Sequence, residues 1–144
     1  MDRPPAPTQR SRGLLVGAVA AIVLAGALAA GTASALLPYS VHVRVAPTTV
    51  AKGSNFRVSA NGNSSNSSIL VVFLAAKACA TTATEERSLG AAEVISHPVV
   101  GLYLRSRTIL AHVPGNHYAC AYLIGTPPQS LLRGRASTAY VVTP

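Results

Sequence analysis

Residues 69–76 read Ile-Leu-Val-Val-Phe-Leu-Ala-Ala, and this stretch decides the fold class of the chain. A short, continuous apolar run of this kind is typical of a strand that is buried on both of its faces. A polar run of Asn, Gly and Ser precedes it over residues 61–68, and Lys77 follows it. We therefore expect residues 69–76 to form the central strand of a sheet, and residues 61–68 to form a mobile surface loop.

Further strands are predicted on both sides of the central one. Val41, Val43 and Val45 alternate with polar residues, and this period of two is typical of a half-buried strand. By the same criteria we expect strands at residues 56–60, 116–124 and 136–142, and two more within residues 94–113, with breaks near Gly101 and Ser106. About seven short strands predict an all-β fold, a sandwich of two sheets.

One short helix is also expected. Thr82 stands three residues before Glu85, which is the spacing of a helix capping box. This predicts a helix of one or two turns that ends at Gly90.

The first 35 residues predict a segment that directs export. Three arginines outnumber Asp2 in the first 13 residues, and residues 14–30 are uniformly apolar or small. Basic residues hold this end on the cytoplasmic side, so the remainder is expected to face the outside of the membrane. Residues 36–144 then form the exported domain.

Three interpretations of the apolar segment stay open. The sequence Ala33-Ser34-Ala35 suits a signal peptidase, which predicts cleavage after Ala35. The run from Leu14 to Leu37 is also long enough to remain as a membrane anchor across a hydrocarbon core of about 30 Å. A third interpretation is a helix buried in the globule. The expected location is secreted, or anchored to the outer face of the cytoplasmic membrane.

Cys79 and Cys120 are the only cysteines, and both follow the export segment. Because an exterior compartment is oxidising, an intramolecular disulfide is the simplest use of the pair. Two buried free thiols, an intermolecular bridge and metal binding are the alternatives.

A family resemblance is carried by a turn followed by a Tyr two residues before a Cys. This resembles strand F of immunoglobulin-like sandwiches, in the form found in bacterial secreted domains; the residues are Pro114, Gly115, Asn116, His117, Tyr118, Ala119, Cys120, Ala121 and Tyr122. The resemblance implies a tyrosine corner, in which the Tyr118 hydroxyl bonds to upstream backbone. The chain departs from antibody domains in having no Trp, and in placing Cys79 after the central strand. A non-catalytic extracellular module is implied, with no particular ligand.

Catalytic chemistry is not indicated by the remaining residues. Beyond residue 35 there are three carboxylates, Glu85, Glu86 and Glu93, where a hydrolase needs one that orients a histidine. The four histidines lack the spacing that places two metal ligands on one helical face, and no glycine-rich phosphate loop occurs. We therefore expect no enzyme activity, no metal and no cofactor.

The basic residues suggest one binding hypothesis. Arg105, Arg107, Arg133 and Arg135 form two alternating pairs, and alternation on a strand sends both members of a pair to one face. Together they could bind an anionic cell-surface polymer, whereas nucleic acid is not expected because aromatic residues are few. The primary expectation is an exported structural or interaction module with an unknown protein or polymer partner, held at the membrane if the N-terminal helix is uncleaved.

Overall fold

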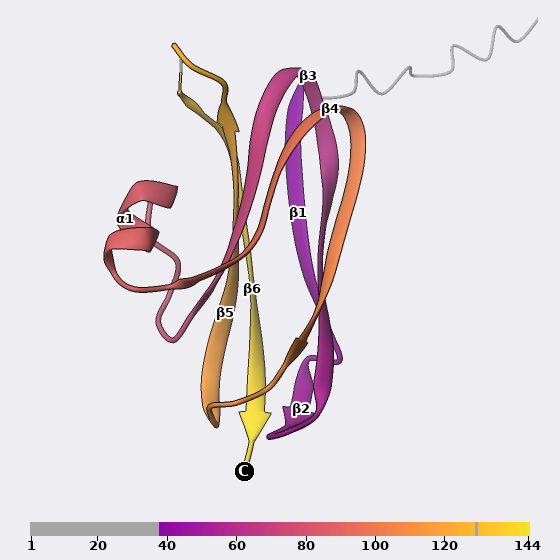
Figure 1. Cartoon of the computed structure of the whole chain (residues 1–144), viewed down its shortest axis with the longest axis vertical. Helices are drawn as coiled ribbons and strands as arrows, with labels where there is room; N and C mark the ends of the chain where they lie inside the picture. Colours follow the sequence, from indigo (N-terminus) through magenta and orange to yellow (C-terminus); the bar gives the residue numbers. More distant parts are fainter. Residues whose placement is uncertain (1–37, 129) are drawn as a thin grey trace, which may run out of the picture. The chain divides into compact units, whose positions relative to one another are not determined.

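The structure, a computed structural model, describes residues 38–128 and 130–144. Its strands are β1 (Tyr39–Ala46), β2 (Thr49–Ala51), β3 (Asn55–Ala75), β4 (Ala92–Leu110), β5 (Gly115–Gly125) and β6 (Leu132–Thr143), and its helix is α1 (Ala83–Ser88) (Figure 1). The expected all-β fold is therefore confirmed. The predicted export helix and its cleavage site lie outside the described residues. Within the described ranges, no helix has the length and apolarity needed to cross a bilayer.

All six strands belong to one continuous sheet, not to the two separate sheets expected, and β3 and β4 bend so that this sheet folds into two layers. The first half of β3 pairs with β1 and with the second half of β4, whereas its second half pairs with β5 and with the first half of β4. The register breaks between Ser64 and Ser68, and Gly101 of β4, opposite Ser64, has a φ of 67°. A positive φ suits glycine, so both strands can turn at the same level. The second layer continues through β6, with β2 parallel to it at its edge.

The central strand is buried on both faces, as predicted. Leu70 and Val72 point into the core between the layers, together with Ala121 and Leu123 of β5. Val71 and Phe73 point to the opposite face, which is covered by α1 and by the segment that carries the disulfide. Figure 1 shows α1 on the outer side of the layer that contains β5.

The prediction of a mobile loop at residues 61–68 is wrong. These residues belong to β3, and residues 61–64 pair with both β1 and β4. Polar composition did not prevent strand formation because the side chains of Asn61 and Ser65 face solvent. Those of Ser64 and Ser68 are buried but bond to each other at 2.6 Å.

The two strands predicted within residues 94–113 are one strand. Gly101 marks a bend of β4, and Ser106 lies inside the strand opposite Ser59. The predicted short helix is confirmed: the backbone N–H of Glu85 donates to the Thr82 hydroxyl at 3.2 Å, which caps α1.

Candidate functional site

The predicted disulfide is present. Cys79 and Cys120 are bonded, with their Cα atoms 5.6 Å apart, and the bridge ties the segment after β3 to β5. Glu86 of α1 lies beside the bridge, and its carboxylate and the two sulfurs are within 4.8 Å of one another. Because both sulfurs are used in the disulfide, this cluster does not offer the thiolates that a metal needs. Among the described residues it is the only such cluster, so the four histidines do not gather.

Glu86 is a buried acid with defined partners. Its Oε2 accepts a hydrogen bond from the Ala80 backbone N–H at 2.6 Å and lies 2.8 Å from the Tyr122 hydroxyl. The Tyr122 hydroxyl is also 2.8 Å from the Ala80 carbonyl oxygen, which accepts from Arg135 at 3.2 Å. The pKa of the Tyr122 hydroxyl is raised, mainly by burial and to a smaller extent by its hydrogen bond to Glu86. These contacts anchor α1 to β5, and the Glu86 carboxylate is already used in structural hydrogen bonds.

Of the two tyrosines that flank Cys120, the one whose hydroxyl bonds to upstream backbone is Tyr122, which follows Cys120 by two residues. Tyr118, the residue implied by the family resemblance, is half-buried beside the disulfide. No hydrogen bond of its hydroxyl occurs in the described part of the chain. The tyrosine hydroxyls that donate to distant backbone oxygens there are those of Tyr122 and of Tyr103, which donates to Ser40 O at 2.8 Å. Both Tyr118 and Tyr122 fit a Tyr-x-Cys-x-Tyr pattern, so sequence spacing alone could not separate them.

The two predicted arginine pairs lie on different strands that are not neighbours. Arg133 of β6 donates to Ser67 O at 2.9 Å, and its guanidinium lies 4.7 Å from the Tyr39 ring centre. Arg135 is bound to Ala80 O. Arg105 and Arg107 belong to β4, which is separated from β6 by β3 and β5 in the sheet. The structure thus places each pair in its own environment.

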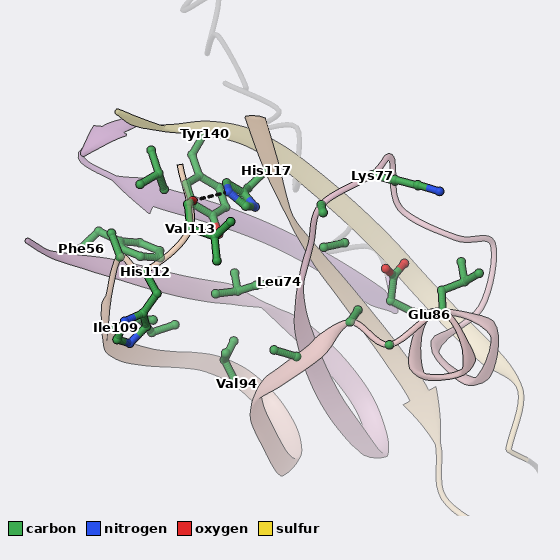
Figure 2. A pocket seen from close by; sticks show the side chains of 18 of the residues that line it. Phe56, Leu74, Lys77, Glu86, Val94, Ile109, His112, Val113, His117 and Tyr140 are labelled. Carbon is green, nitrogen blue, oxygen red and sulfur yellow. Dashed lines mark hydrogen bonds between the residues drawn. The ribbon is translucent and has the colours of Figure 1, made fainter. Parts of the chain in front are cut away.

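An apolar pocket of about 500 Å³ lies between the two layers. Figure 2 shows side chains of both layers converging on it. Its apolar lining includes Phe56, Leu74, Val94, Ile109, Tyr140 and Val142. A volume of this size is within the usual range for small-molecule sites.

Exposed apolar side chains surround the mouth of the pocket. Leu89, next to the end of α1, is 68% exposed, and Val113, in the turn before β5, is 63% exposed. Leu110 at the end of β4 is also exposed. Apolar surface that continues from a pocket onto its rim favours an apolar ligand, because burying it removes more area from water.

Few ionisable groups reach this pocket, and they do not converge. Glu86 is bonded as described above, and the His117 ring nitrogen Nε2 lies 2.8 Å from the Val113 carbonyl oxygen while the ring stacks on Tyr140. Figure 2 shows Lys77 extending away from the apolar side chains and His112 in a different part of the lining from His117. Burial raises the pKa of Tyr140 to about 12, so at neutral pH it presents a neutral ring. The arrangement can bind an apolar molecule. Among the described residues that line the pocket, no nucleophilic side chain is hydrogen-bonded to a side chain that could act as its general base.

Sequence reasoning missed this pocket. Its lining comes from β3, α1, β4, β5 and β6, so no local motif could reveal it. The one available signal was the presence of Leu89 and Val113 beside the turn residues Gly90 and Pro114, where polar residues are usual.

No protein-family model matches the sequence, and neither does any curated protein. Solved structures with a similar fold include the CARDB domain of a Pyrococcus furiosus protein in complex with di-metal ions, at 9% identity over 75% of this chain and 90% of that chain, with a TM-score of 0.48. Another is the alkylpurine DNA glycosylase AlkC of Pseudomonas fluorescens, at 15% identity over 74% of this chain and 31% of that chain, with a TM-score of 0.44. A β-glucosidase of Erythrobacter marinus aligns at 11% identity over 73% of this chain and 16% of that chain, also with a TM-score of 0.44. Each likeness concerns the fold alone.

Proposed function

We propose that this protein is an exported, non-catalytic binding module with an immunoglobulin-like sandwich, and that the pocket between its layers takes an apolar ligand. The observation that carries the proposal is the pocket itself: about 500 Å³, with an apolar lining and an apolar rim. The disulfide supports an oxidising compartment, which fits the export expected from the N-terminal sequence.

The carboxylates support a non-catalytic role. Glu85 accepts hydrogen bonds from the backbone and hydroxyl of Thr81, Glu86 is bonded to Ala80 and Tyr122, and Glu93 forms a salt bridge with Arg87 at 2.7 Å. None of these acids bonds to a histidine in the described residues, so the triad arrangement of hydrolases is not formed there.

Photolabelling tests the pocket. An uncharged dodecyl probe carrying a diazirine is expected to crosslink to the pocket lining of the protein in its native envelope. Ala92 is the residue to enlarge, because it pairs with Leu74 and so shares the face that lines the pocket. Ala92→Trp should reduce labelling by about tenfold or more, since the indole occupies part of the volume. Ala46→Trp, on exposed β1 surface away from the pocket, is the matched control.

Two results would contradict the proposal. One is labelling that is spread over the surface or unchanged by Ala92→Trp. The other is recovery of the protein from the cytosol with its N-terminus intact; N-terminal sequencing distinguishes a mature chain that begins at Leu36 from an anchored one that begins at Met1.

A further inference from the structure

A second, polar cleft lies between the two halves of β4. It has a volume of about 420 Å³ and shares only Val94 with the lining of the apolar pocket. Residues 93–97 of the first half form one wall, including Ser96 and His97, and residues 105–107 of the second half form the other. The cleft exists because β4 bends at Gly101 and its halves join different layers.

Arg105 and Arg107 lie on the same side of β4. Side chains alternate along a strand, so residues two apart share a face and are about 7 Å apart. Tyr103, two residues before Arg105, is buried in the core between the layers. The two arginines therefore project to the interior side of the sheet, at the point where the layers separate and solvent enters.

These two guanidinium groups have no carboxylate partner. Glu93 also lines the cleft, but its carboxylate forms a salt bridge with Arg87 at 2.7 Å, the only salt bridge found in the described residues, and Glu85 and Glu86 are not part of the lining. The bonds that the arginines do make are to backbone: Arg107 donates to Val94 O at 2.9 Å, and Arg105 to Leu104 O at 3.0 Å. A carbonyl oxygen fixes the position of a guanidinium without neutralising it, so two positive charges remain at the cleft.

We propose that this cleft binds an oxyanion of the phosphate type through Arg105 and Arg107. A guanidinium presents five N–H donors in a planar fork that fits two oxygens of such an anion, and each arginine uses one nitrogen in its backbone bond. His97, which lines the cleft from the other wall, shares its side of β4 with the core residue Ile95. The source of the anion is either a free phosphate compound or a phosphate-bearing polymer.

Calorimetry with the full-length protein, in a non-ionic detergent where the N-terminal segment is retained, tests the site. The probes are pyrophosphate and long-chain polyphosphate. Arg105→Gln/Arg107→Gln should weaken binding by roughly tenfold or more, because two charge-assisted contacts are lost. Arg44→Gln/Arg57→Gln removes the same charge from exposed positions of β1 and β3 outside the cleft and should leave affinity within about twofold.

The chemical shifts of Ser96, His97 and Ser106 amides provide a second readout on the unsubstituted protein. They should move on addition of either probe, and a tighter affinity per phosphate for polyphosphate would identify a polymer as the source. Equal loss of binding in both double variants, or shifts confined to other residues, would overturn the proposal. So would failure of both probes to bind at low salt, where electrostatic attraction is strongest.

Discussion

At the scale of single residues, Glu86 is the polar side chain that we expect to contribute most to the stability of the fold. It is 1% exposed, and one oxygen serves both the Ala80 N–H and the Tyr122 hydroxyl. Glu86→Ala would leave a buried backbone donor without its acceptor, and we expect a loss of roughly 1 to 3 kcal/mol in the free energy of unfolding. Urea denaturation with the disulfide intact measures this loss.

The neighbouring Glu85 supplies the control. Its side chain is exposed and bonds to Thr81 at the surface, so Glu85→Ala should lower stability much less than Glu86→Ala. Equal losses in the two variants would show that the buried bonds of Glu86 contribute nothing particular to the fold.

At the scale of elements, β3 shows what the sequence could and could not reveal. Alternation and a continuous apolar run correctly predicted both of its halves, and the capping pair Thr82 and Glu85 correctly predicted α1. The link between the halves was missed, because local composition does not show that β1 and β4 supply backbone partners for residues 61–64. The same reason hid both clefts, whose walls come from segments that are brought together only by the bends of β3 and β4.

Gly62 provides the prediction for this element. A Cβ at this position would overlap the Ser40 carbonyl oxygen of β1 and approach the Tyr103 hydroxyl to 2.7 Å. Because the carbonyl oxygen is backbone and cannot rotate away, Gly62→Ala should force β1 from β3 and cost about 1 to 3 kcal/mol. Asn61→Ala, one residue earlier and exposed, is the control and should change the urea midpoint little. A Gly62→Ala protein as stable as the Asn61→Ala protein would mean that β1 does not lie this close.

At the scale of the whole molecule, the disulfide joins segments that are 41 residues apart in sequence. Closing a loop of that length restricts the unfolded chain by roughly 4 kcal/mol in the chain-entropy model. We therefore expect Cys79→Ser/Cys120→Ser to lower the free energy of unfolding by up to that amount. The unsubstituted protein should show no reactive thiol until a reductant is added, and two thiols titrated in the folded exported form would contradict the bridge.

The response of the molecule to alkaline pH follows from its buried tyrosines. Burial raises the pKa of Tyr103 and of Tyr140 to about 12, and it also raises the pKa of Tyr122. An unfolded tyrosine ionises near pH 10, so the folded state binds protons that the unfolded state has released above that pH. Stability should be at its full value below about pH 10 and should fall as the pH rises from about 10 to 12. Urea midpoints across this range, with tyrosinate absorbance near 295 nm, measure the effect. Tyr140→Phe keeps the ring and removes one titrating group, so its stability should fall less steeply with pH. Ionisation of all five tyrosines near pH 10 in a chain that stays folded would contradict their burial.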